Sequence, residues 1–159
     1  MSSTQLIKAV PKIWSGNTYG TRLSTQNHWY VGNYSLGTSI TTGDWVDDVF
    51  EKTYYPYFIA AHACVITSVG FAGGTNWSND YEVQFWHINF DSGDTQADSA
   101  SQVGTTISLS SPGTSHMLFR QVSGLSVSLA VGDCVFHVAR FTSGGTNKYL
   151  YINPVIGYK

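Results

Sequence analysis

Strand-like segments separated by turn-forming residues constrain the fold of this chain more than any other feature. They are rich in β-branched and aromatic residues, and clusters of Gly, Asn, Asp and Ser close them. The segments span residues 62–71, 81–90, 105–110, 115–122, 125–131, 133–142 and 147–153, the last continuing to Tyr158. Helical periodicity is nearly absent, and only residues 44–52 favour one or two helical turns. The pattern predicts an all-β fold, an antiparallel β-sandwich or jelly roll.

The composition favours the same class. Charged residues make up 11% of the chain, against about 25% in a typical globular domain. Thr, Ser, Gly and Asn replace them, which suits the solvated faces of sheets better than those of helices. A chain of 159 residues fits one domain, which can bury roughly 70% of the surface that its unfolded chain exposes. One core between two sheets is therefore sufficient.

The N-terminal third of the chain has a looser pattern. Two short strand-like pieces, at residues 5–10 and 28–31, stand among Gly, Ser, Thr and Asn. We therefore predict a partly extended N-terminal arm over residues 1–52, which either wraps the sandwich or docks on a neighbour, and a β-sandwich domain over residues 53–159. Three tryptophans fall in the predicted arm, and each ring must be buried on this domain or on a partner. They are Trp14, Trp29 and Trp45.

The charge and the apolar runs argue against several partners. The formal net charge is −2 and the eight Lys and Arg residues are scattered, so no basic patch is available to release counterions from nucleic acid. The longest apolar runs are too short to span a bilayer, so we expect no membrane. The N-terminal residues lack the charged and apolar regions of a secretory signal, which predicts that the chain is made in a cytoplasm and is not exported by that route.

Four residues are of types that bind zinc, namely His62, Cys64, Cys134 and His137. Side chains alternate across a strand, so Cys134 and His137, three residues apart, point to opposite faces. Without a bulge the set cannot converge, and we predict no metal. A disulfide between Cys64 and Cys134 is one alternative, and two free buried thiols are favoured in a reducing cytoplasm.

The acidic segment at residues 91–98 is a candidate for calcium, because its three carboxylates could supply several of the oxygens that the ion needs. It lacks the spacing of an EF-hand loop, and a solvated turn is the simpler interpretation. The sequence contains no nucleophile elbow, phosphate-binding loop, zinc-protease motif or dinucleotide-binding motif. We therefore predict no catalytic residue and no cofactor, and we expect that the protein is not an enzyme.

The aromatic residues are the remaining candidates for binding. Residues 54–58 hold four rings, and Trp77 stands in a predicted loop. Such rings serve subunit interfaces or ordinary core packing, and stacking on a glycan is a further alternative. The interface or binding candidates are Trp14, Trp29, Trp45, Tyr54, Tyr55, Tyr57 and Trp77.

The stretch from Tyr55 to Lys159 has a distinctive order of strands and one turn. Residues 63–71 form an apolar strand, a Tyr-x-Val-x-Phe strand begins at Tyr81, and a Leu-x-x-Gly-Asp turn at residues 129–133 joins two late strands. This order resembles the small β-sandwich virion proteins of tailed phages. It also resembles the jelly roll of the tumour-necrosis-factor and complement-C1q type.

The resemblance implies a structural protein located in the virion, often a trimer. A capsid decoration (cement) protein is the leading interpretation. Its partner would be the major capsid protein or another virion protein, gripped by the arm of residues 1–52. The alternative is a receptor- or glycan-binding module at the tip of a tail fibre. No individual functional residue is carried over, because the pattern supplies none.

Overall fold

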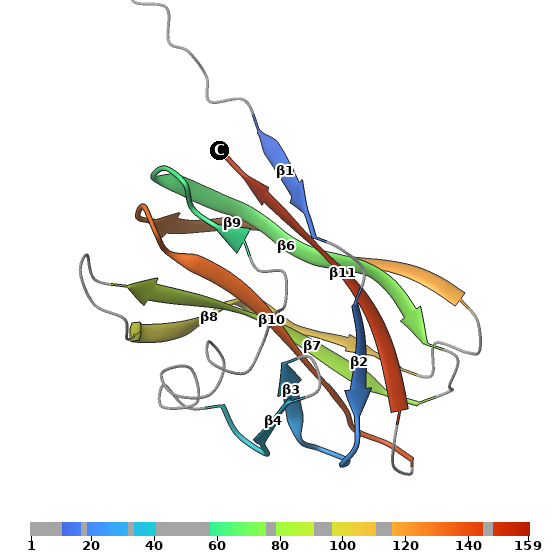
Figure 1. Cartoon of the computed structure of the whole chain (residues 1–159). Coiled ribbons are helices and arrows are strands. Elements are labelled where there is room, and N and C mark those ends of the chain that lie inside the picture. Colours follow the sequence, from blue (N-terminus) through green and yellow to red (C-terminus); the bar gives the residue numbers. More distant parts are fainter. Residues whose placement is uncertain are drawn as a thin grey trace, which may run out of the picture.

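Two antiparallel β-sheets make up the computed structural model of the chain (Figure 1). The structure describes residues 11–16, 19–31, 34–40, 58–75, 79–90, 97–110, 116–144 and 148–159. The regular elements of these ranges are strands, which confirms the predicted all-β class for them. The helical turns predicted at residues 44–52 lie outside the described residues. In the described ranges no helix has the length and hydropathy needed to cross a bilayer.

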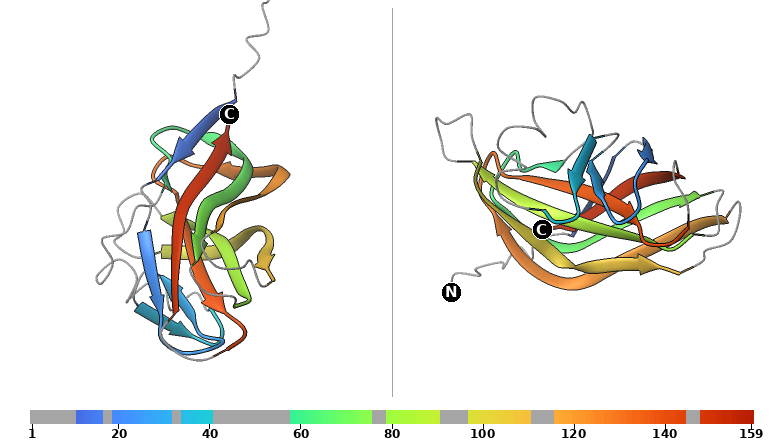
Figure 2. Two further views of the ribbon diagram at one scale, coloured as in Figure 1. Left: turned by 90° about the vertical axis from the view of Figure 1, so that its right-hand side faces the viewer. Right: turned by 90° about the horizontal axis from the view of Figure 1, so that it is seen from below.

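The first sheet, sheet A, has β11 (Lys148–Tyr158) at its centre. On one side β11 pairs with β6 (Cys64–Thr75), which pairs in turn with the edge strand β9 (His116–Leu129). On the other side β11 pairs with β1 (Lys12–Ser15) and, further along, with β2 (Tyr19–Leu23). Figure 2 shows β1 lying against β11 beside the C-terminus. Residues from both ends of the sequence are therefore held in one sheet.

The second sheet, sheet B, is built around β10 (Cys134–Phe141), which pairs with β7 (Tyr81–Phe90). β7 pairs in turn with the edge strand β8 (Ala97–Leu109). On its other side β10 pairs with β5 and with β3, and β3 pairs with β4. These three strands are β3 (Trp29–Val31), β4 (Tyr34–Gly37) and β5 (Phe58–Ile59).

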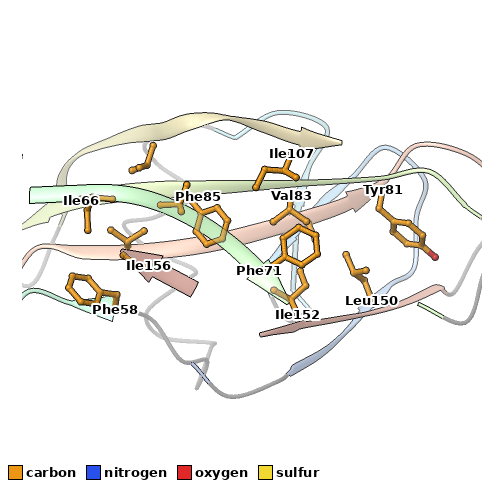
Figure 3. Close-up of a cluster of buried hydrophobic side chains, with 14 of the residues drawn as sticks. Phe58, Ile66, Phe71, Tyr81, Val83, Phe85, Ile107, Leu150, Ile152 and Ile156 are labelled. Carbon is orange, nitrogen blue, oxygen red and sulfur yellow. The ribbon is translucent and has the colours of Figure 1, made fainter. Parts of the chain in front are cut away.

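A continuous apolar core fills the space between the two sheets. Phe71 and Ile152 enter it from sheet A, and Val83 and Phe85 enter it from sheet B. Figure 3 shows these side chains meeting between strands of the two sheets. Burying a side chain of this size contributes about 1.5–3 kcal/mol. The core therefore holds the sheets face to face in a sandwich-like arrangement.

The strand β9 differs from the prediction in its continuity. The sequence predicts two strands, at residues 115–122 and 125–131, where the structure has the single strand β9. Gly124 lies at the predicted break and has a φ of 75°, a conformation that glycine adopts readily. The register of β9 against β6 shifts between Ile66 and Ser68, so this glycine stands in a bulge inside a continuous strand. A left-handed glycine suits a turn and a bulge equally, and the sequence does not separate them.

The strand predicted at residues 105–110 corresponds to β8, which begins earlier, at Ala97. Its register against β7 shifts between Val83 and Phe85, and Gly104 has a φ of 73°. A bulge therefore hides the continuity of this strand as well. Residues 91–96 of the acidic segment lie outside the described residues, so the calcium alternative is not tested there.

The described strands of the predicted arm are part of the sheets. β1 and β2 pair with β11, and β3 pairs with β10 through Tyr30 and Ala139. Such pairing is what an arm that wraps the sandwich would form, and the division into an arm at 1–52 and a sandwich at 53–159 stays a prediction. The strands are short, and the partners that complete them lie more than a hundred residues away along the chain, at Ala139 and beyond. The sequence pattern within a short segment does not show pairing with such a distant strand.

Candidate interaction surface

The outer face of sheet A is the leading candidate for a binding surface. In β11, Ile152, Pro154 and Ile156 are buried toward the core, so the residues between them point outward. The strand register places their partners on β1, β6 and β9 on the same side. We call this surface the sheet A face. Its residues are Ile13, Ser15, Ser68, Gly70, Ala72, Gly74, Phe119, Gln121, Ser123, Tyr151, Asn153, Val155 and Gly157.

The middle of the sheet A face is made of small residues. A Cβ atom on Gly70 would collide with the carbonyl oxygen of Arg120, on the neighbouring strand β9. A Cβ atom on Gly157 would meet the hydroxyl oxygen of Ser68. Because the strands approach each other this closely, larger side chains do not fit at these positions. The centre of the face is therefore low and flat.

Large apolar side chains stand around this flat centre. Ile13, Phe119 and Tyr151 are exposed to 76%, 53% and 48%. The other exposed large hydrophobic residues of the described ranges are Ile59 and Val131. The residues named for the sheet A face on β1, β6, β9 and β11 include no charged side chain, whereas β2 places Arg22 opposite Tyr149 at the far end of β11. Ser15 Oγ donates a hydrogen bond to Asn153 Oδ1 over 3.1 Å. An uncharged surface with exposed large apolar side chains is typical of a contact with another macromolecule.

Part of the outer face of sheet B, over β3 and β10, is also apolar, and there it is buried within the chain. Trp29, Phe136 and Val138 lie there in a cluster separate from the main core. The guanidinium carbon of Arg140 is 4.4 Å from the centroid of the Trp29 ring, a cation–π arrangement. Arg140 Nε also donates a hydrogen bond to Glu82 Oε2 over 2.7 Å. We call this surface the sheet B face, and its one described cation is thus held by a carboxylate and a ring.

The aromatic residues predicted from sequence fall into three groups. Trp29 is buried on the sheet B face, so its ring packs on this domain, the first of the two alternatives given for it. Trp14 is half-buried, and its ring meets that of Phe58 edge-on with 5.8 Å between centroids. The remaining candidates lie outside the described residues. They are Trp45, Tyr54, Tyr55, Tyr57 and Trp77.

The sequence does not single out Ile13 or Phe119, although both are exposed on the sheet A face. An isolated apolar residue in a strand pattern points to the core or to solvent according to register, and a slip of one residue reverses the choice. Phe119 faces outward because β9 pairs with β6 at Ala72, on the side of the bulge away from the β9–β10 turn. Only the small residues opposite these side chains, Gly157 opposite Ile13 and Ala72 opposite Phe119, could have indicated a flat face.

The residues that suggested zinc are packed as ordinary side chains. Cys64 and Cys134 are free and buried. Burial, together with the charge of Asp133, raises the pKa of the Cys134 thiol to about 12. Burial lowers the pKa of His137 to about 4. A thiol that stays protonated is a poor nucleophile. Across the described ranges, no three His, Cys, Asp or Glu side chains are placed to hold a metal ion.

A buried carboxylate supports the turn between β9 and β10. Asp133 Oδ2 accepts a hydrogen bond from Ala130 N over 2.9 Å and lies 2.8 Å from His87 Nε2. The second oxygen, Oδ1, is buried and has no hydrogen-bond partner among the described residues. An unpaired buried oxygen costs folding free energy. The turn is therefore fixed from beneath, at a cost to stability.

No protein-family model and no curated protein matches this chain. The search of solved structures also gave no match. Function is therefore inferred from the strand pairing and from the sheet A face.

Proposed function

We propose that this chain is a structural protein of a tailed-phage virion, which assembles as a trimer through the sheet A face and decorates the capsid shell. The observation that carries the proposal is the exposure of Ile13, Phe119 and Tyr151 around a flat centre that lacks charge. The resemblance of the sequence to small virion proteins supplies the setting.

The sheet A face favours association between copies of the chain. Burying it removes apolar surface from water without the cost of desolvating unpaired charges. Large apolar and aromatic side chains contribute most of the binding energy of a typical contact, and Phe119 and Tyr151 are side chains of this kind. A cyclic trimer forms when one part of this face on each copy contacts a different part of the face on the next copy, so that the ring closes.

We also propose that the sandwich is a jelly roll, and the strand pairing supports this topology. Four strand pairs are nested in sequence order. The outermost is β2 with β11, followed by β3 with β10, β6 with β9, and the innermost, β7 with β8. A jelly roll forms when one long antiparallel ribbon with such pairing folds over into two sheets. The folds that the sequence resembles are of this kind, and virion proteins among them are often trimers.

Decoration would stabilise the shell through mass action. A protein that binds the assembled shell, and not its free subunits, shifts the equilibrium toward the shell by its free energy of binding. The major capsid protein, or another virion protein exposed on the shell, is the proposed partner. The low share of charged residues, 11%, suits a broad contact that is insensitive to ionic strength.

Two measurements test the proposal. Light scattering during size-exclusion chromatography should give three times the chain mass of 17.4 kDa. Quantitative mass spectrometry of purified virions should find a copy number set by the symmetry of the shell. A few copies per particle would instead favour the tip of a tail fibre, and absence from the particles would overturn the proposal.

A further inference from the structure

We infer that Arg120 prevents the edge strand β9 from pairing with a second copy of the chain, so that the sheets of different copies do not join edge to edge. The inference goes beyond the proposed function, because it concerns a contact that the chain excludes, whether or not a trimer forms. Among the described strands of sheet A, β9 pairs with β6 alone and forms one edge of the sheet. An edge strand presents unpaired backbone groups to which another chain can bind.

The two halves of β9 differ in regularity. After Ser123 the register against β6 shifts, and Gly124 stands in a bulge, which bends a strand and interrupts its pairing. From His116 to Ser123 the register is unbroken. This regular half, residues 116–123, is therefore the part of the edge to which a further strand could be added. Arg120 lies in the middle of it.

Arg120 is the one Lys, Arg, Asp or Glu residue of β9. β-branched and aromatic residues such as Phe119 and Val122 favour strands. A long edge strand of this composition without a charge is a site of aggregation. The arginine therefore supplies the one charge that separates the regular half of β9 from this class of strand.

Arg120 belongs to the row of side chains on the core side of sheet A, and yet it remains in water. Its partner on β6, Phe71, is buried in the core, and Leu118 and Val122, two residues to either side, pack against that core. Arg120 itself is exposed. Its Nη1 donates a hydrogen bond to Phe119 O over 3.0 Å, which holds the guanidinium beside the backbone of the edge strand. A strand added there would cover the guanidinium, and removing an unpaired charge from water opposes the contact.

The opposite edge of sheet A has a similar arrangement at β1. Trp14 packs against the core, so Lys12, two residues earlier, lies on the core side as well. Lys12 is exposed and is the one charged residue of β1.

The directions of the two edge strands identify the partner that is excluded. Each strand of sheet A is antiparallel to the next, so β1 and β9, separated by β11 and β6, run in opposite directions. The β1 edge of one copy could therefore continue the sheet at the β9 edge of another, and repetition would build an open-ended fibre. A second copy of the chain is thus the partner whose pairing Arg120 opposes.

The experiment compares four folded proteins by sedimentation velocity over a series of concentrations. They are the wild type, Arg120→Val, Arg120→Lys and the matched control Thr105→Val. Thr105 is an exposed residue of β8, the edge strand of sheet B, where a bulge already interrupts the strand. Arg120→Val should lower the concentration at which species of higher mass appear by roughly tenfold or more, because its edge has no charge to desolvate. Arg120→Lys and Thr105→Val should behave as the wild type does.

Two further variants identify the contact. In Arg120→Val combined with Tyr151→Lys the larger species should persist, because they form at the edge and not through the sheet A face. Arg120→Thr removes the charge and leaves a small strand-forming side chain, so it should associate as Arg120→Val does. It keeps the test valid if circular dichroism shows that the valine variant folds poorly.

The outcomes separate this inference from the proposed function. Arg120→Val and Arg120→Thr that keep the mass of the wild type overturn the inference, and so does Arg120→Lys that associates as the valine variant does. Larger species that disappear when Tyr151→Lys is added also overturn it, because the sheet A face would then form them. A monomeric wild type refutes the proposed trimer instead, and the comparison of Arg120→Val with Arg120→Lys still decides this inference.

Discussion

Sheets A and B both carry apolar residues on their outer faces, but the two faces differ in what covers them. On the sheet B face, Trp29 and Phe136 are buried within the chain. On the sheet A face, Phe119 and Tyr151 remain in water. Apolar surface therefore has two roles in this one domain. On sheet B it contributes to the stability of the single chain, and on sheet A we propose that it serves assembly.

The polar residues of the two faces differ in the same sense. The sheet B face has a complete ion pair, between Arg140 and Glu82, and the Trp29 ring lies beneath the guanidinium. The sheet A face has hydroxyl and amide groups, such as Ser15 and Asn153, and no ions. Charged groups are costly to bury between subunits unless they are paired. A face that binds a partner therefore loses less free energy to desolvation when it carries no charged side chain.

The largest effect should come from placing a charge on the sheet A face. Tyr151→Lys should raise the dissociation constant of the trimer by roughly ten-thousandfold or more, because an unpaired ammonium would have to leave water at each of the three equivalent contacts. Analytical ultracentrifugation would measure it. The melting temperature of the monomer should change little, since Tyr151 is half exposed. Thr105→Lys places the same charge outside the face and is the control. A Tyr151→Lys variant that assembles normally would contradict the proposed role of this face.

The reverse result is expected on the sheet B face. Trp29→Ala should lower the free energy of unfolding by about 3–5 kcal/mol, because it empties a large volume in a buried cluster. Trp29→Phe should cost less. Urea denaturation measures both variants at a concentration where the chain is monomeric. The folded fraction of Trp29→Ala should still assemble. Loss of assembly without loss of stability would show that the two faces are not separate in function.

A third prediction concerns His137, which lies on β10 with its ring 6.2 Å from that of Phe85. Its pKa is lowered by burial to about 4, while an unfolded chain has its ordinary value of about 6.5. Between these values the unfolded state binds more protons, so stability is full above pH 6.5 and falls as the pH drops toward 4.

The loss should approach about 3 kcal/mol near pH 4. Denaturant titrations at neutral and acid pH measure it, and His137→Leu should flatten this part of the pH dependence. His62→Ala, at an exposed histidine, is the control. An unchanged pH dependence in His137→Leu would show that acid lability has another source. This test sharpens the comparison of the two faces, because protonation of His137 should lower the stability of the whole fold without changing either outer face.

The smallest effect is expected for the ion pair of the sheet B face. Both side chains are partly exposed, so Glu82→Gln should cost less than about 1 kcal/mol. A double-mutant cycle with Arg140→Met isolates the interaction between the two charges. A coupling energy of several kcal/mol would mean that the ion pair, and not the apolar cluster around Trp29, holds β3 against the outer side of sheet B.

The strand content of the fold could be predicted from sequence, and the extent of some strands could not. β7 has the bounds that its pattern predicts, Tyr81–Phe90, because its turns are marked by Gly, Asn and Asp on both sides. The sequence predicts a break in β9 at Gly124, because a bulge and a turn use the same residue type. The sequence does not predict β1 and β2 as strands, since four or five residues form a strand only through a partner such as β11.

The candidate surface was harder to predict than the fold. Tryptophans draw attention in a sequence, yet Trp29 is buried, and Trp45 and Trp77 lie outside the described residues. The residues that define the sheet A face, Ile13 and Phe119 among them, have no distinguishing local pattern. Their exposure depends on how four strands are aligned, and alignment is a property of the whole sheet.

The central position of β11 in sheet A has a consequence for the kinetics of folding. Its partners β1 and β2 lie at the opposite end of the sequence, so Trp14 must find Ile156 across most of the chain. Pairing between such distant residues is entropically slow to nucleate, and folds rich in it take milliseconds to seconds. Before β11 pairs with β6, β6 has an unpaired edge and apolar side chains in water, and such a strand can pair with other chains and aggregate. Dilute refolding and low temperature should therefore raise the yield of native protein.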